Sequence, residues 1–237
     1  IPGPETRSYT ERQPGLRQRL SSERHRYLEY LKLVSYEFAR GGDCIILGRG
    51  GQVLFADVPG VVRVRVVAPL ADRVARVKAG AGGEEGRIRQ ALQHADNERA
   101  GFHRFLLRVN WDCPELYDLI IDTHRLSAQA AADVILEALG SQEVKNKRPE
   151  ARRKLEELYR VQQALVTILF EERLAIHGLV VSTADGTVLL RGTAEARSSI
   201  ERATDVAQKL FGAKRVVNQI AFEPRFAGIM AGSSLEH

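Results

Sequence analysis

Cysteine is scarce in this sequence of 237 residues: Cys44 and Cys113 are the only two. Two cysteines cannot form a disulfide framework, so the chain is expected to fold in a reducing compartment, the cytoplasm. Long hydrophobic runs are also lacking, because no window reaches the ~18 apolar residues of a membrane-spanning helix. Residues 1–25 are polar and rich in arginine, which predicts no secretory signal peptide.

Lysine is sparse as well, and arginine supplies most of the positive charge. The chain has 35 basic and 30 acidic residues and a formal charge of +5, and only seven of the basic residues are lysines. Arginine favours bidentate contacts with phosphate or carboxylate, so phosphate ligands and nucleic acid both come into consideration. Basic and acidic residues are interspersed rather than blocked, which favours a solvated surface for most arginines and disfavours nucleic acid as a partner.

Several motifs of catalysis and metal binding are missing. The histidines and cysteines form no H-E-x-x-H or C-x-x-C grouping, so no metal site is predicted. No lysine is preceded by glycine and followed by Ser or Thr, so the phosphate loop G-x-x-x-x-G-K-[ST] is absent from this chain. The glycine cluster at 80–86 carries two glutamates that would repel phosphate, and we interpret it as a flexible joint.

What is present between residues 21 and 140 is a regular alternation of helix and strand. A helix is predicted from Ser21 or Ser22 to Gly41, with an apolar face of Leu28, Leu31, Val34 and Phe38. Short strands are predicted at Cys44–Leu47 (buried), Val61–Ala68 and Asp118–Ile121, and further helices at 70–78, 84–107 and 127–140. The alternation predicts an α/β domain with a mostly parallel sheet and helices on both faces.

The carboxyl-terminal part predicts a second, smaller α+β domain at 150–223. The charged segment 141–149 is predicted to be a linker. A long helix, a hairpin around Asp185-Gly186, an amphipathic helix and a last strand follow in that order. Residues 1–20 are predicted to be a flexible arm, and residues 224–237 a tail that ends in the remnant of an affinity tag.

Three blocks of the first domain, GRGGQVLFADVPGVVRVRVVAPLADRVARV, HADNERAGFHRF and NWDCPELYDLIIDT, resemble the cytidylate kinase-like family of P-loop kinases. The resemblance implies a partial P-loop-kinase-like sheet and transfer of phosphate from ATP to CMP, with ATP and Mg²⁺ as cofactors. It implies that Gly48, Arg49 and Gly50 contact the monophosphate and that Arg73 lies near the ATP base. It also places Asp96 and Arg99 on a mobile lid that clamps the transferred group.

Elementary chemistry agrees with these roles, although a structural alternative stays open. Phosphoryl transfer needs positive charge around the migrating group, which lid arginines provide. Arg49 would follow a strand at the edge where open α/β sheets bind ligands. Alternatively, Arg73 and Arg99 are exposed helix arginines that pair within a turn, as Arg99 could with Asp96.

The sequence also departs from the family. Without a phosphate loop, this polypeptide by itself is expected not to transfer phosphate from ATP, and Gly50 stands where family members carry an acid. The family fold implies a central strand between Cys44–Leu47 and Val61–Ala68, and no apolar run before residue 44 supplies it. Three arrangements would supply or replace the missing central strand: an upstream segment, direct pairing of the two flanking strands, or a strand from another chain. The open slot predicts self-association into a homo-oligomer.

The second domain resembles a BON domain over about residues 150–223. The pattern G-x-V-x-L-x-G falls on Gly186, Val188, Leu190 and Gly192, and V-x-N-x-I on Val216, Asn218 and Ile220. The resemblance implies binding of a phospholipid surface or a small ligand, as in bacterial envelope proteins, and this module is expected to act in regulation or assembly. By themselves, the two glycines have structural explanations that need no ligand: Gly186 indicates a turn, and Gly192 the passage from a strand into a loop.

Two main functional hypotheses follow. The first is a nucleoside monophosphate kinase-like protein that is inactive in this chain. The second is a non-catalytic regulatory protein whose first domain senses a nucleotide or phosphate ligand, and whose BON unit binds a membrane surface or a protein partner. Nucleic-acid binding by the arginine-rich arm and lid is a third hypothesis, which salt-dependent retention on DNA would support.

Overall fold

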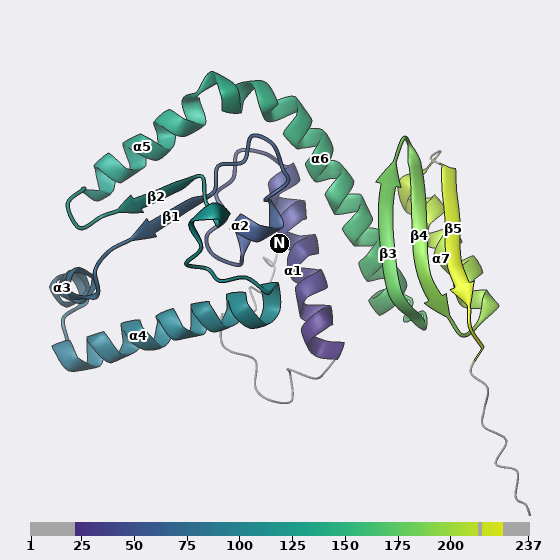
Figure 1. Cartoon of the computed structure of the whole chain (residues 1–237), viewed down its shortest axis with the longest axis horizontal. Helices are drawn as coiled ribbons and strands as arrows, with labels where there is room; N and C mark the ends of the chain where they lie inside the picture. Colours follow the sequence, from purple (N-terminus) through teal and green to yellow (C-terminus); the bar gives the residue numbers. More distant parts are fainter. Residues whose placement is uncertain (1–21, 213–214, 225–237) are drawn as a thin grey trace, which may run out of the picture. The chain divides into compact units, whose positions relative to one another are not determined.

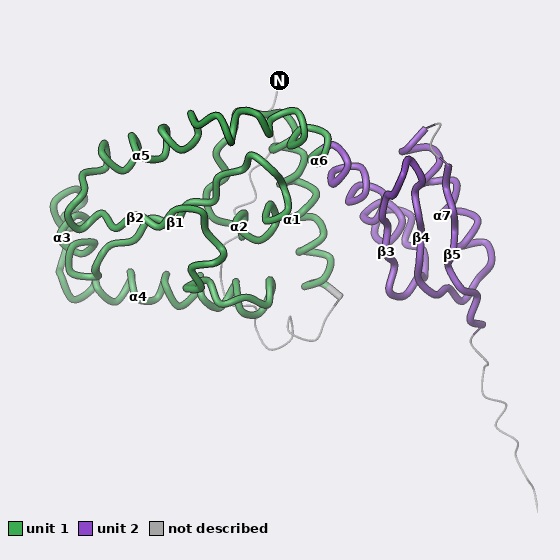
Figure 2. Tube along the Cα trace, turned by 45° about the horizontal axis from the view of Figure 1, so that its top comes forward, with its two compact units in different colours: residues 1–155 green, residues 156–237 purple. Residues whose placement is uncertain are grey.

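The computed structural model describes residues 22–212 and 215–224. The chain divides into two compact units, residues 1–155 and 156–237 (Figure 2). The predicted arm at 1–20 and nearly all of the predicted tail at 224–237 lie outside the described residues.

Helix α6 (Gln142–Val166) passes from the first unit into the second. The segment 141–149, which we predicted to be a linker, is therefore almost entirely helical. Its glutamate, lysine and arginine side chains favour helix as much as they favour solvent, so charge alone did not distinguish the two. Ser141 supports the start of the helix, because its Oγ accepts a hydrogen bond from the Val144 amide at 3.4 Å.

The first unit alternates helices with two parallel strands, which confirms the α/β prediction. Strands β1 (Val64–Val67) and β2 (Leu119–Asp122) pair in parallel, from Val64 opposite Leu119 to Val67 opposite Asp122. They lie between α5 (Ala128–Gly140) and α4 (Glu85–Phe102) in Figure 1. The other elements are α1 (Ser22–Arg40), α2 (Gly51–Leu54), α3 (Leu70–Ala81), a π-helix at His103–Leu107 and a 3₁₀ turn at Pro114–Leu116.

Polar contacts fasten both ends of this small sheet. At its start, Arg63 donates from Nη2 to Asp118 Oδ1 at 2.7 Å and from Nε to Oδ2 at 3.1 Å. The hydrogen bonds from Arg63 hold the pKa of Asp118 below its ordinary value. At the other end, the Thr123 amide donates to the Val67 carbonyl at 2.8 Å. The register is thus set at both ends, so the residues that flank the strands have defined positions.

The prediction of a buried strand at Cys44–Leu47 is wrong. These residues have no regular structure, and Ile45 and Leu47 are 93% and 92% exposed. An apolar run forms a strand only where a neighbouring strand pairs with it and a packed face covers it. Strand β1 pairs with β2 instead, so direct pairing between Cys44–Leu47 and β1 does not occur.

Helix α1 has nearly the predicted bounds but buries a different face. Val34 and Phe38, from the predicted apolar face, are 46% and 67% exposed, whereas Tyr36 and Ala39 are buried. The ring of Tyr36 meets that of Phe55 edge to face, with centroids 5.7 Å apart. Burial is the main reason why the pKa of Tyr36 is raised to about 12. The helix therefore uses an aromatic and a small residue, rather than its aliphatic stripe, for packing.

The second unit is a three-stranded sheet with helices on one face, as expected for a BON-like α+β domain. The strand order is β3 (Ile176–Ala184), β4 (Thr187–Ala194) and β5 (Arg215–Phe222). Strands β3 and β4 are antiparallel, and β4 and β5 are parallel. Helix α7 (Arg197–Phe211) packs on β4 and β5. The residues with no exposed area in this core are Ala164, Ile168, Val188, Leu190, Ala203 and Ala207.

Two predicted motif positions in this unit have clear structural roles. Asp185 and Gly186 have φ values of 48° and 76°, as a two-residue type I′ hairpin turn requires, which confirms the Asp-Gly signal. Asn218 donates from Nδ2 to the Ile200 carbonyl at 2.9 Å, and its Oδ1 accepts from the Ile220 amide at 2.8 Å. Asn218 therefore fastens β5 to α7.

Candidate anion-binding site

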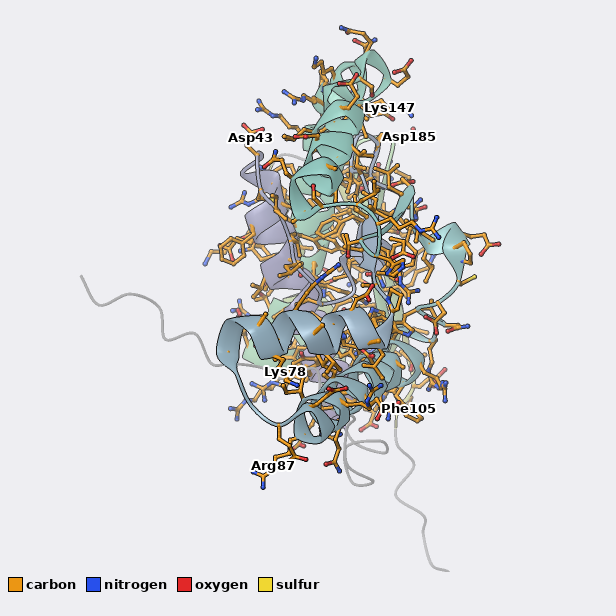
Figure 3. All side chains as sticks on the ribbon, turned by 90° about the vertical axis from the view of Figure 1, so that its left-hand side faces the viewer. Asp43, Lys78, Arg87, Phe105, Lys147 and Asp185 are labelled. Atoms are coloured by element: carbon orange, nitrogen blue, oxygen red, sulfur yellow. The ribbon has the colours of Figure 1, made fainter. Side chains whose placement is uncertain are left out.

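Helices α3 and α4 pack together and supply most charged side chains of the site. Gly82 ends α3 with a φ of 69°, and Gly83 follows with a φ of 109°, which lets the chain reverse. Lys78 and Glu85 face each other across this connection at 3.6 Å, and Figure 3 labels Lys78 there. The glycine cluster of the sequence thus joins two helices.

Three of the predicted site residues come together, because two arginines converge on the carboxylate of the third, Asp96. Arg73, on α3, donates from Nη1 to Asp96 Oδ1 at 3.0 Å and from Nη2 to Oδ2 at 2.7 Å. Arg99, one turn along α4 from Asp96, donates from Nη2 to Oδ1 at 2.6 Å. The first contact is the bidentate geometry by which arginine also binds phosphate, and the second is the within-turn pair that we considered.

The electrostatics of this group are those of a partly dehydrated site. The side chains of Arg73 and Asp96 are each 29% exposed, and that of Arg99 is 37% exposed. Burial by itself would raise the pKa of Asp96, but hydrogen bonds and charge from Arg73 and Arg99 outweigh it and lower this pKa. Asp96 is therefore ionised at neutral pH, and two positive charges face one negative charge.

An aromatic group flanks the arginines, and sequence reasoning missed its connection to them. The Arg65 guanidinium, from β1, lies 4.6 Å from the ring centroid of Trp111, and that of Arg99 lies 5.9 Å from it. Arg65 also donates to the Trp111 carbonyl at 2.6 Å and to Asp112 Oδ1 at 2.5 Å. Arg65 interrupts an apolar strand, and this pattern was the signal that could have marked it as a site residue.

The π-helix that follows α4 contributes a buried histidine. His103 is 4% exposed, and its Nδ1 forms a hydrogen bond with the Arg99 carbonyl at 2.7 Å. Its ring lies 5.7 Å from that of Trp111, centroid to centroid. Single π-turns within helices often occur at functional sites, and here the π-turn places His103 between Arg99 and Trp111.

The other three predicted site residues form a turn before α2. Gly48, Arg49 and Gly50 have φ values of 73°, 57° and 74°, so three consecutive residues are left-handed. A Cβ on Gly50 would lie 2.2 Å from Leu107 Cδ1, at the end of a flexible side chain that would have to move, so the left-handed conformation is the main reason for glycine there. The turn is a separate segment from the Arg73–Asp96–Arg99 group, and its contact with a nucleotide stays a prediction.

The described part of the chain contains neither a cluster of metal-ligating side chains nor a membrane-spanning helix. Across residues 22–212 and 215–224, no three His, Cys, Asp or Glu side chains gather in a way that could hold a metal ion. Binding of Mg²⁺ and ATP, which the family resemblance implies, stays a prediction, and we assign no step to either. Of the described helices, none combines the length and the apolar character needed to cross a bilayer.

Comparison with known proteins identifies the family. The model of the cytidylate kinase-like family matches residues 6–125, just over half of the chain, and the chain belongs to this family. A BON domain matches residues 161–224. The first unit thus carries the kinase-like sequence and the second the BON sequence, as the two resemblances implied.

The individual proteins to which the chain is similar share less than a third of their aligned residues with it. The chain is 29% identical over 93 residues to uronate isomerase from Corynebacterium glutamicum. This match covers 39% of the chain and spans 18% of the length of that enzyme. An uncharacterized protein from Eubacterium ventriosum aligns in structure with a TM-score of 0.45 and 19% identity, over 52% of this chain and 67% of its own.

Proposed function

We propose that the first unit binds a nucleoside monophosphate, with CMP as the nominal ligand, and that Arg73 and Arg99 contact its phosphate. The observation that carries the proposal is the convergence of two guanidinium groups, from different helices, on a single carboxylate. Arginine binds carboxylate and phosphate through the same fork of donors, so a site that holds one suits the other. Membership of the cytidylate kinase-like family supports CMP as the ligand.

The proposed activity is binding rather than phosphoryl transfer. Transfer from ATP requires backbone amides and a lysine around the ATP phosphates, and the 237 residues contain no G-x-x-x-x-G-K-[ST] motif. The role that remains for the first unit is that of a nucleotide-sensing domain coupled to the BON unit.

A fluorescence titration tests this proposal, because Trp111 is the only tryptophan and borders the site. CMP is expected to change the Trp111 emission in a saturable manner as Arg99 moves to the phosphate. Cytidine, which lacks the phosphate, is the control and is expected to have no effect at the same concentrations. Equal responses to both compounds, or no binding of CMP, would contradict the proposal.

We also propose that the BON unit binds anionic phospholipid surfaces. One face of its sheet packs on helices, and the register places Arg191 and Arg215 on the other face. Strands β3, β4 and β5 contain no acidic residue, and Glu195, directly after β4, pairs with His177 of β3. The two arginines therefore give the strands a net positive charge. Each basic residue near an anionic membrane contributes about 1 kcal/mol to binding.

Vesicle sedimentation tests the second proposal. The protein is expected to sediment with vesicles of phosphatidylglycerol but not phosphatidylcholine, and Arg191→Glu with Arg215→Glu should abolish sedimentation. Arg202→Glu is the matched control, because Arg202 lies on α7 and pairs with Glu172 instead. Equal sedimentation with both lipids, or no effect of the double charge reversal, would show that this face is not a membrane-binding surface.

A further inference from the structure

We infer that helix α6 carries a nucleic-acid-binding surface, a basic stripe of Lys145, Arg148 and Arg152 that contacts the phosphate backbone of a duplex. All three residues lie in the part of α6 that belongs to the first unit. None of them belongs to the Arg73–Asp96–Arg99 group, so the inference does not depend on the nucleotide site proposed above.

The helix separates charges that are mixed in the sequence. In the first half of α6, acidic and basic residues are interspersed along the chain. At 3.6 residues per turn, however, Lys145, Arg148 and Arg152 share one face, because their spacing is i, i+3, i+7. Glu143 lies about 160° around the helix from Lys145, and Glu150 about 160° from Arg152. The stripe therefore presents three positive charges, and both glutamates point away from it.

The three cations of the basic stripe are available to a partner. Each is exposed, and none has a hydrogen bond or an ion pair among the described residues. They differ in this respect from Arg63 and Arg73, which pair with Asp118 and Asp96. The next acid on the same face, Glu156, already accepts a hydrogen bond from an arginine one turn further along α6. A phosphate that binds the stripe therefore has no carboxylate to displace.

The chemistry of this face suits a nucleic-acid backbone better than a bilayer. Ala151 and Leu155 are buried and Val144 is half-buried, so this stretch of α6 exposes charge without a large apolar side chain. A helix that lies in a membrane interface inserts an apolar face, which this stretch does not offer. The stripe extends about 10 Å along the helix axis, over which a duplex carries about six phosphate charges. Three contacts are therefore within reach of one duplex segment.

Fluorescence anisotropy of labelled DNA and RNA duplexes, titrated with the full chain at several salt concentrations, tests the inference. The wild type is expected to bind, with an affinity that falls linearly with salt on logarithmic axes. Lys145→Gln, Arg148→Gln and Arg152→Gln together keep the helix propensity and remove the three charges. This stripe variant should bind at least about tenfold more weakly at low salt, and its salt slope should be smaller by about 2.7, or about 0.9 for each lost phosphate contact.

The matched control combines Arg87→Gln, Arg89→Gln and Arg202→Gln. It removes the same number of positive charges, from exposed residues that pair with carboxylates. The control variant should keep its affinity within about twofold of the wild type and leave the salt slope almost unchanged.

Each outcome has a defined meaning. Binding of either duplex that the stripe variant loses and the control variant keeps would support the inference. Equal losses in the two variants would overturn it, because net charge would then govern binding. Binding that is unchanged in the stripe variant would overturn it as well, and would assign the duplex to other arginines. If neither duplex binds, and the stripe variant instead loses sedimentation with phosphatidylglycerol vesicles, the stripe is a membrane surface and the inference is wrong.

Discussion

Replacing Arg73 and Arg99 together with alanine is expected to weaken CMP binding by about a hundredfold or more. Hydrogen bonds to charged groups contribute about 1.5–3 kcal/mol each, and about 1.4 kcal/mol corresponds to tenfold in affinity. Each single replacement should therefore cost about tenfold or more. The double variant should lose about a hundredfold rather than the full sum at the upper end of this range, because both arginines act on the same phosphate. Calorimetric titration of CMP into each variant measures the loss.

Arg87→Ala is the matched control for these variants. Arg87 lies on the same helix as Arg99, but its side chain is 87% exposed and pairs with Glu84 at the start of α4. The control removes one positive charge without touching the site, so it should leave CMP affinity within about twofold of wild type. An equal loss in the Arg87 variant would show that net charge, rather than the arginine pair, governs binding.

The second large effect is expected in the BON unit, where Leu190→Ala should lower the free energy of unfolding by about 2–5 kcal/mol. Leu190 lies on the central strand β4 and has no exposed area, so its loss removes buried apolar surface and leaves a cavity. Leu189→Ala is the control, because the neighbouring side chain points to the opposite face of the sheet. It should cost less than about 1 kcal/mol.

Amide hydrogen exchange is the appropriate measurement for this pair, because Trp111 lies in the other unit and its fluorescence does not follow unfolding of the BON unit. Amides of β3 and β4 should exchange much faster in Leu190→Ala than in Leu189→Ala. Comparable protection in the two variants would contradict the assignment of Leu190 to the core.

The sequence predicted those elements whose signals are local. The Asp185-Gly186 hairpin depends on two residues that tolerate positive φ, and Ser127 caps α5 by accepting a hydrogen bond from the Ala130 amide at 3.1 Å. The parallel pairing of β1 and β2 was also predictable, because helices alternate with strands along the chain.

Two of the failures depend on tertiary partners. The run Cys44–Leu47 has the composition of a strand but no pairing neighbour among the described residues, and composition alone cannot reveal that. Helix α1 has more than one apolar stripe, and the one that packs is decided by the position of Phe55. The helix through 142–149 has a local cause instead, because its charged side chains favour helix as much as they favour solvent.

In the candidate site, too, the local contacts could be predicted from the sequence and the long-range contacts could not. The Asp96–Arg99 pair could be anticipated from a spacing of three residues on one helix. The Arg73–Asp96 contact joins residues 23 positions apart, and Arg65 contacts residues 46 and 47 positions away, so both depend on how the elements pack. The residue types that bind phosphate were therefore predictable, whereas their convergence on a single carboxylate was not.

Calorimetric titration of CMP into the intact chain is the measurement that tests the central claim most directly. The account predicts saturable heat with one CMP bound per chain, and loss of that heat in the Arg73→Ala, Arg99→Ala double variant. Absence of heat with the wild-type protein, or binding that survives in the double variant, would contradict a nucleotide site built on these two arginines.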